Sequence, residues 1–535
     1  MATTIVGTKQ LNGITVAMVL GALGVAGAGC GPDQPAMGPN AMTDSLGAAP
    51  NATANNSAAA RTAVRPIAPL SGSMSGSRQP IFRYTPARNA TVDVCDDRAC
   101  AHVVEELNGS NGRAQPATPL RAGLLFWRVV SNRTSSAVWQ LTIPGRDTGA
   151  SIAWGVVPDF NGDGFADVAI GSPAPGSQNV SVFNGGVFAP GFTPDETLTG
   201  GDLFGRAVAS AGDVNGDGFV DLAVAAGAGP GSVTVFLGGP AGPGGAGTSL
   251  SPGAVTSGFG TTMASAGDVN GDGYGDLLVG GVEHAQVYLG GPNGIAAAAA
   301  FTLAGSTANG ATGDASVVQG PSDVNADGAP DLYVGGALYV SSPAGLVAEA
   351  AFANAFGTAF GSFAGDANGD GFGDFAAYQV FPGTPDGIDV KSSLFIQAGE
   401  ITLGTAGDID GDGFSDIISS LSAIENFGDR QRVYLGAPGS CGSTGCRPFL
   451  SVPIPGHDFN GNNLTAFLGG VGDVNNDGID DLVASVPDNG QAFLFRSDGG
   501  VTDINHTAFA FPTWTFAPGF GSSFAALFGT VRPLF

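Results

Sequence analysis

The chain has 535 residues, of which 89 are Gly and 34 are Pro, and 43% of the residues are apolar. Glycine at this density is costly in helices and suits turns, so the composition excludes a helical bundle, and the apolar fraction excludes disorder throughout. The chain has 19 basic and 46 acidic residues and a net charge of −27. It therefore has too little positive charge for a nucleic-acid-binding surface. We therefore expect an all-β protein rich in turns, with a substantial core.

Residues 1–29 have the pattern of a bacterial export signal, with Lys9 followed by the apolar run Leu11–Gly29. Gly27, Ala28 and Gly29 precede Cys30 and resemble the cleavage site of lipoproteins, which implies lipidation of Cys30. We expect an exported lipoprotein of the outer membrane or cell surface that touches the membrane only through Cys30. The alternative is an ordinary secretory signal, which would give a secreted protein.

The other four cysteines form two pairs with identical spacing, Cys95 with Cys100 and Cys441 with Cys446. Two local disulfides formed in an oxidising compartment explain this spacing most simply. A zinc site would require the two pairs to meet, although they lie in different regions of the chain.

Residues 30–79 are rich in Ala, Gly, Ser, Asn and Pro, and include Asn51–Ala60 and Ser71–Ser77. Such segments have few apolar residues with which to form a core, so we expect a disordered tether.

Residues 80–146 contain alternating apolar and polar positions that predict β-strands, notably at Leu125–Val130 and Ala137–Ile143. Ile81–Tyr84 and Thr91–Val94 predict two more strands, and Cys95 and Cys100 would close the first hairpin. The pattern resembles the small fibronectin type III-like β-sandwiches of exported bacterial proteins.

The remainder, residues 147–535, contains seven copies of one nine-residue pattern, Asp-x-Asn/Asp-x-Asp-Gly-x-x-Asp. Successive copies begin 54, 55, 55, 43, 42 and 65 residues apart. An apolar strand follows each copy, as at Val168–Gly171 and Leu222–Ala225, and a second strand comes later, as at Val233–Phe236.

The spacing suits a calcium ion. Side-chain oxygens at positions 1, 3, 5 and 9 and the backbone carbonyl at position 7 provide most of a shell of six to eight hard oxygen ligands, and Gly at position 6 permits the sharp bend. Magnesium fits less well, because it prefers octahedral sites that keep several waters. The predicted ligands of up to seven calcium ions are, copy by copy, Asp159, Asn161, Asp163, Phe165 and Asp167; Asp213, Asn215, Asp217, Phe219 and Asp221; Asp268, Asn270, Asp272, Tyr274 and Asp276; Asp323, Asn325, Asp327, Ala329 and Asp331; Asp366, Asn368, Asp370, Phe372 and Asp374; Asp408, Asp410, Asp412, Phe414 and Asp416; Asp473, Asn475, Asp477, Ile479 and Asp481.

Two other interpretations of these loops fit less well. An EF-hand needs Glu at position 12 and flanking helices, whereas the first two copies have Ile170 and Val224 there, in β-rich surroundings. Turns without a metal ion would not need three carboxylates within nine residues, since these repel one another.

The loops, together with Phe204-Gly205 and Phe259-Gly260 nine residues ahead of Asp213 and Asp268, resemble the FG-GAP repeats of the integrin α-chain propeller. This resemblance implies a seven-bladed β-propeller with calcium-binding hairpin loops over residues 147–535, at about 56 residues per four-stranded blade. Gly519–Ala526 aligns with Gly258–Ser265 but no loop follows it. We expect this tail either to close the ring or to begin an incomplete eighth blade.

We find no catalytic motif. His102, His284, His457 and His506 form no ligand-spaced cluster, and the common hydrolase and nucleotide-binding motifs are missing from the sequence. We therefore expect a monomeric, non-enzymatic scaffold of the binding or adhesion type for protein or polysaccharide, with no bound cofactor other than calcium. An exported propeller enzyme acting on polysaccharide or phosphoester, or a structural envelope component, are the alternatives.

Overall fold

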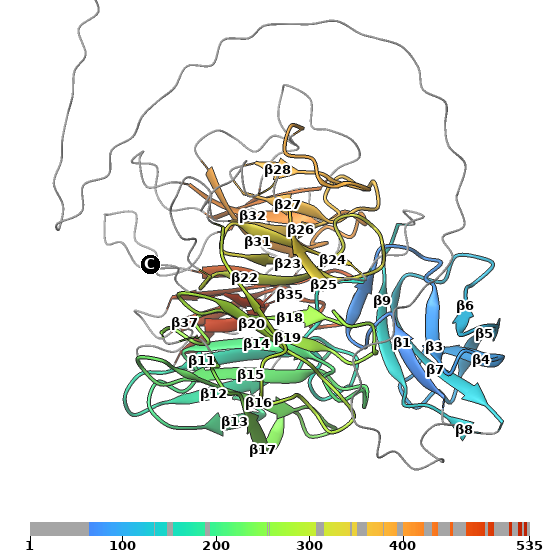
Figure 1. Cartoon of the computed structure of the whole chain (residues 1–535), viewed down its shortest axis with the longest axis horizontal. Helices are drawn as coiled ribbons and strands as arrows, with labels where there is room; N and C mark the ends of the chain where they lie inside the picture. Colours follow the sequence, from blue (N-terminus) through green and yellow to red (C-terminus); the bar gives the residue numbers. More distant parts are fainter. Residues whose placement is uncertain are drawn as a thin grey trace, which may run out of the picture. The chain divides into compact units, whose positions relative to one another are not determined.

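The computed structural model describes residues 64–531 with gaps, the longest of which are 437–449, 453–466 and 497–512. Contacts divide the chain into Met1–Asn51 and Ala52–Phe535, and only the second unit is considered below. The predicted signal, Cys30, Cys441 and Cys446 lie outside the described residues. Within those residues every named element is a β-strand (Figure 1), and no helix has the length and apolarity needed to span a membrane.

The N-terminal domain contains two β-sheets, whose strands span residues 65–154. The smaller sheet has the order β1 (Arg65–Ala68), β3 (Phe82–Thr85), β6 (Arg113–Ala114). The larger has the order β10 (Ala153–Trp154), β2 (Ser73–Ser75), β9 (Trp139–Ile143), β7 (Gly123–Ser131), β4 (Ala90–Cys95), β5 (Val103–Gly109), with β8 (Thr134–Ser135) on β7. In the core the buried ring of Trp127 packs against Phe82 in a tilted contact and against Trp139 edge to face, with centroids 4.9 and 5.6 Å apart.

The predicted disordered tether is wrong for residues 64–79. β1 and β2 lie in this segment, and Ser71, Ser73, Ser75 and Ser77 are all buried. The physical reason is hydrogen bonding: the Ser75 hydroxyl donates to Ser77 O at 2.7 Å, and β2 pairs in parallel with β9, so these polar groups have partners inside the fold. The predicted boundary at 146–147 also shifts, since β10 pairs with β2 and so belongs to the N-terminal sheet.

The predicted disulfide between Cys95 and Cys100 is present. It closes the turn between β4 and β5, which form an antiparallel hairpin.

The repeats form a series of small antiparallel sheets, one per nine-residue loop, and most have four strands. In chain order from the second repeat they are β14 (Ala207–Gly212), β15 (Asp221–Ala226), β16 (Ser232–Leu237), β17 (Gly244–Ser249); β18 (Met263–Gly267), β19 (Asp276–Val279), β20 (Ala285–Tyr288), β21 (Phe301–Leu303); β22 (Val318–Ser322), β23 (Asp331–Val334), β24 (Ala337–Ser342), β25 (Gly345–Ala348); β26 (Ser362–Gly365), β27 (Asp374–Ala376), β28 (Val380–Phe381), followed by the hairpin β29 (Gly383–Thr384), β30 (Gly387–Ile388); β31 (Glu400–Gly407), β32 (Asp416–Leu421), β33 (Gln431–Tyr434), β34 (Leu450–Val452); and β35 (Phe467–Gly472), β36 (Asp481–Val486), β37 (Gln491–Phe495), β38 (Thr513–Thr515).

Hydrophobic clusters lie between neighbouring sheets rather than within one. In β15, Leu222 and Val224 pack with the first repeat, whereas Ala223 and Ala225 pack with the third. This alternation follows from the period of two residues in a strand. Each sheet therefore buries both of its faces only by stacking on two neighbours.

The sheet of the first repeat is completed by the end of the chain. Its order is β13 (Glu196–Thr199), β12 (Asn179–Phe183), β11 (Val168–Ser172), β39 (Ser523–Ala526), β40 (Gly529–Val531). β39 pairs antiparallel with β11, as β14 pairs with β15 in the next repeat. The C-terminal segment thus adds β39 to the first sheet, in the place beside β11 that β14 takes beside β15 in the second.

The first strands of the sheets contact one another in chain order. β14 contacts β18, then β18 contacts β22, and the series continues through β26, β31 and β35. β39 contacts both β35 and β14, so the series returns to its beginning.

A chain that ends at residue 515 tests this closure. It lacks β39 and β40, so Ile170 and Gly171 of β11 lose the strand that pairs with them. We expect a loss of roughly 1.5–3 kcal/mol in the free energy of unfolding, which is the cost of exposing one aliphatic side chain, that of Ile170. Calorimetry of both chains measures this loss, and an unchanged melting temperature would contradict the role of β39.

Candidate functional site

The seven nine-residue loops are all described, and all have the same hydrogen-bonded framework. Loops 2–7 each connect the first and second strands of a sheet, and position 9 is the first residue of the second strand, as for Asp221 in β15. Loop 1 ends at Asp167, directly before β11. We number the loops 1–7 from Asp159 to Asp473.

The aspartate at position 9 is a buried structural residue in every loop; its exposed fraction is 0% in all seven copies. In loop 2, one oxygen of Asp221 accepts from Val214 N at 2.8 Å and the other from Gly238 N at 2.7 Å. The second bond links the loop to the residue just after the third strand. Equivalent acceptor pairs occur at Asp167, Asp276, Asp331, Asp374 and Asp416, and Asp481 accepts from Val474 N.

The aspartate at position 1 bends the loop. Asp213 Oδ2 accepts from Gly218 N at 2.7 Å and Oδ1 accepts from Gly216 N at 2.7 Å. The bond to the position 6 glycine is present in all seven loops. Gly218 has a φ of +97°, which is why the bend requires glycine.

Positions 3 and 5 form a more exposed pair of side chains. In loop 2, Asn215 Nδ2 donates to Asp217 Oδ2 at 2.8 Å, and Asp217 Oδ1 accepts from Phe219 N at 3.0 Å. The same amide-to-carboxylate bond occurs in loops 1, 3, 4, 5 and 7. Position 5 is exposed in every loop except loop 3, where Asp272 is half-buried.

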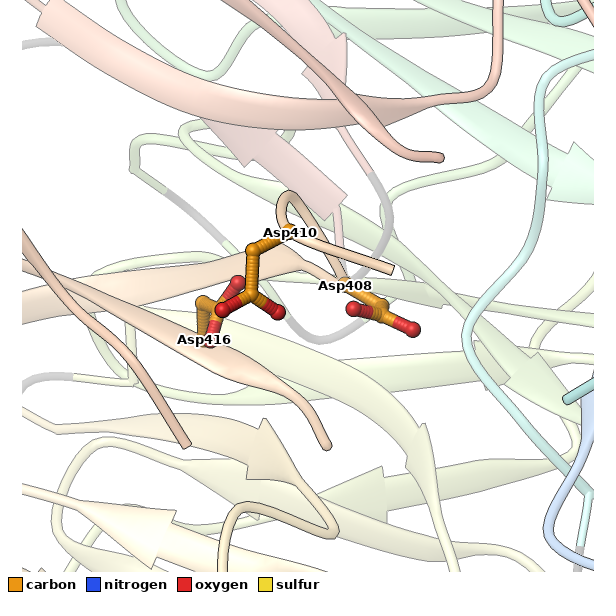
Figure 2. Close-up of side chains that lie close together, drawn as sticks. All are labelled: Asp408, Asp410 and Asp416. Atoms are coloured by element: carbon orange, nitrogen blue, oxygen red, sulfur yellow. The ribbon is translucent and has the colours of Figure 1, made fainter. Parts of the chain in front are cut away.

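Loop 6 differs because Asp410 replaces the amide at position 3. One carboxylate oxygen each from Asp408, Asp410 and Asp416 lies within 4.8 Å of the others, and Figure 2 shows the Asp410 carboxylate between the other two. Three anionic groups this close have a donor set of hard oxygens that suits a divalent cation. Loop 6 is therefore where the arrangement most favours an ion.

Burial raises the pKa values of the carboxyl groups at positions 1 and 9 of the loops. Burial, with repulsion from the neighbouring carboxylates, raises the pKa to about 7 for Asp159, Asp213, Asp268, Asp323 and Asp408 and to about 6 for Asp366 and Asp473. The pKa of the position 9 carboxyls is raised well above the usual range in loops 1–6 by the same causes. Without a cation the charged forms are thus costly inside the loops.

Neighbouring loops are joined by a backbone hydrogen bond that sequence analysis missed. The N–H at position 8 donates to the carbonyl at position 1 of the preceding loop, as from Gly275 to Asp213 at 2.8 Å. The bond recurs at Val220, Gly373, Ser415 and Asp480, and Ala166 of loop 1 donates to Asp473 of loop 7 at 3.0 Å. Loop 4 has Pro330 at this position, which has no N–H to donate to loop 3.

The side chain at position 7 packs on the preceding loop, although only its carbonyl entered the predicted ligand set. A Cβ on Gly216 of loop 2 would lie 2.9 Å from the ring of Tyr274 in loop 3. Phe219 covers Gly162 and Phe414 covers Gly369 in the same way. The aromatic residues at position 7 were the only sequence signal for this contact.

A cavity of about 320 Å³ lies beside loops 6 and 7. Asp408, Asp473 and Phe414 line one side of it, and Leu124 and Ile143 of the N-terminal domain line another. The N-terminal domain therefore lies against these loops.

Comparison with known families agrees with the loop pattern. Residues 159–224 and 213–279 each match the FG-GAP-like repeat family. This segment carries FG-GAP-like repeats. A search of curated proteins gives no match.

Two solved structures show distant similarity. A DUF4784 family protein from Bacteroides caccae is 10% identical, with a TM-score of 0.27 over 87% of this chain and 98% of that one. Rhamnogalacturonan lyase PL11 from Bacillus licheniformis is 12% identical, with a TM-score of 0.22 over 82% of this chain and 76% of that one. TM-scores this low carry no argument about the FG-GAP-like repeats.

The structural and exposed aspartates of one FG-GAP-like loop should respond differently to substitution. Asp221→Ala leaves the buried Val214 N–H and the half-buried Gly238 N–H without an acceptor, and we expect a loss of at least about 2 kcal/mol, with or without a chelator. Asp217→Ala removes an exposed carboxylate and should cost less than about 0.5 kcal/mol in chelator. Urea denaturation measures both, and equal losses would contradict the distinct roles.

The raised pKa values predict an unusual pH dependence in the presence of a chelator. The folded-state pKa of Asp213 is about 7, above an unfolded value of about 3.9, so the folded state binds the proton more tightly. This contribution to stability is complete below pH ~4 and is lost as the pH rises through about 7. We expect the ion-free protein to melt at a higher temperature at pH 5 than at pH 8. A melting temperature that rises over this range would contradict the assignment.

Proposed function

We propose that the repeats form a seven-bladed, calcium-stabilised β-propeller, which acts as an interaction scaffold for a protein or polysaccharide. The main observation in support of a closed ring is the hydrogen bond from Ala166 N in the first loop to Asp473 O in the last. An open stack of repeats would leave its two end loops apart, whereas a closed ring brings them together. The return of the first-strand contacts from β35 through β39 to β14 also supports it.

Calcium is supported by the chemistry of the loops. At the ligand positions 1, 3, 5 and 9, six loops have three carboxylates each and loop 6 has four. Asp408, Asp410, Asp412, Asp416 and the carbonyl of Phe414 would hold an ion there, with equivalent residues in the other loops. Bound ions would supply the positive charge that the buried carboxylates need, and seven dications would change the formal charge from −27 to −13.

The expected gain in stability is large because the sites are numerous. At about 2 mM free calcium and a Kd of about 0.1 mM, each site contributes roughly 1.8 kcal/mol. Seven independent sites give on the order of 10 kcal/mol, which matches the stability of a whole domain.

An interaction role is supported by the FG-GAP-like repeats themselves. Export and anchoring through Cys30 would display the scaffold at the cell surface, and the proposal includes a non-enzymatic role, since the sequence analysis finds no catalytic motif. The partner would be a protein or a polysaccharide, recognised through the loops and edges of the blades.

Thermal unfolding in calcium and in EDTA, with a metal count, tests the calcium proposal. We expect bound calcium close to seven ions per chain and a melting temperature lower by many degrees in EDTA. Asp217→Ala and Asp272→Ala should each reduce the count by one and weaken binding, while Asp202→Ala, outside the loops, serves as the control. A negligible shift with no bound metal would overturn calcium binding without affecting the ring.

The interaction role is tested separately, with the calcium-loaded full chain as bait. Binding to a defined surface protein or polysaccharide, lost in EDTA, supports the scaffold. Turnover of a polysaccharide or phosphoester that is abolished by an acidic substitution outside the loops would overturn it in favour of an enzyme.

A further inference from the structure

Three arginines of the N-terminal region lie over the position 7 rings of three repeat loops. The guanidinium carbons of Arg65, Arg98 and Arg146 are 4.3, 4.0 and 4.4 Å from the ring centroids of Tyr274, Phe219 and Phe414, respectively. Because these arginines come from separate segments and use the same kind of contact, the arrangement has the character of a built interface.

Arg98 lies between two consecutive loops. Its Nη2 donates to Gly218 O of loop 2 at 2.7 Å. On the other side, a Cβ on Gly162 of loop 1 would lie 2.5 Å from the guanidinium carbon of Arg98. The guanidinium therefore fills the space between loops 1 and 2, close to the carboxylates of both.

Arg98 lies within the loop that the Cys95–Cys100 disulfide closes, residues 95–100, which we call the docking loop. Cys95 and Cys100 are buried and cluster with Phe126, Leu124 and Val138. The disulfide thus packs in a small apolar cluster at the base of the turn that carries Arg98.

The same cluster contacts the bends of the two loops. A Cβ on Gly164 of loop 1 would lie 2.7 Å from Leu124 Cδ2, and one on Gly218 of loop 2 would lie 2.3 Å from Val138 O. In contrast, a Cβ on Gly328 of loop 4 would meet nothing within 4 Å. The docked surface therefore includes loops 1 and 2, and loop 4 offers an internal reference.

Charge favours this contact whether or not an ion is bound. Loop 2 has three carboxylates, Asp213, Asp217 and Asp221, so one dication would leave it with a formal charge of −1. A guanidinium beside the loop supplies the remaining positive charge.

We propose that the docking loop holds the N-terminal domain on loops 1 and 2 through Arg98, with the disulfide as the element that positions this arginine. The parts of loops 1 and 2 that the docking loop covers are then an internal interface, so an outside partner of the scaffold must bind elsewhere. This inference rests on the contacts alone and stands whether or not the loops bind calcium.

Hydrogen exchange of the full-length chain in calcium buffer tests it. Arg98→Gln removes the charge and the ring contact, and we expect about tenfold faster exchange in peptides covering residues 159–167 and 213–221, with no change at 323–331. Arg98→Lys, which keeps the charge without the planar group, should restore part of the protection. Arg113→Gln, an exposed position on β6, is the matched control.

Two outcomes would overturn the proposal. Acceleration below about twofold at loops 1 and 2 would make Arg98 an incidental neighbour. Equal acceleration at loop 4 would mean that Arg98 supports the whole fold rather than the docking.

A second measurement examines the disulfide. Trypsin cleaves after arginines that can enter its active site, and an engaged Arg98 cannot. In the Cys95→Ser/Cys100→Ser chain we expect cleavage after Arg98 to become at least about tenfold faster than in the wild type, with cleavage after Arg113 unchanged. Unchanged cleavage after Arg98 would show that the disulfide does not position it.

Discussion

The structure of the repeats depends on buried aspartate carboxylates that accept backbone N–H groups. At position 9 one carboxylate joins three parts of the same repeat, since Asp221 begins β15 and accepts from Val214 in the loop and from Gly238 beyond β16. A charged acceptor makes a stronger hydrogen bond than a neutral one, but the burial of its charge is costly. The loops are therefore densely hydrogen-bonded and also carry the buried carboxyl groups whose charged forms are costly.

The same loops also hold neighbouring repeats together. The position 8 N–H of one loop also bonds to the position 1 carbonyl of the loop before it. In loops 2, 3 and 6 the position 7 ring covers the glycine at position 4 of the preceding loop. Neighbouring loops are thus in direct contact. Pro330 interrupts the backbone bond at one place, between loops 3 and 4.

The N-terminal domain makes use of the same loops. Its arginines contact their backbone carbonyls and aromatic rings, which are the features that the loop fold leaves on its outer side. Arg98 lies in the disulfide-closed turn between β4 and β5. The small glycines at positions 4 and 6 leave the room for this approach, so they serve the interface as well as the bend.

The sequence by itself determined the loops and most strands, because both depend on neighbouring residues: the spacing of oxygen ligands around a glycine, and an apolar period of two. It failed at Ser71–Ser77, where serines that look like a tether are buried and hydrogen-bonded, Ser71 to the distant Gly218 O and Ser75 to Ser77 O. Only the tertiary structure decided that β39 completes the first sheet, that loop 1 bonds to loop 7, and that Arg98 lies between two loops. These contacts join residues more than a hundred positions apart, and the energy that selects them comes from packing and paired polar groups that no local pattern records.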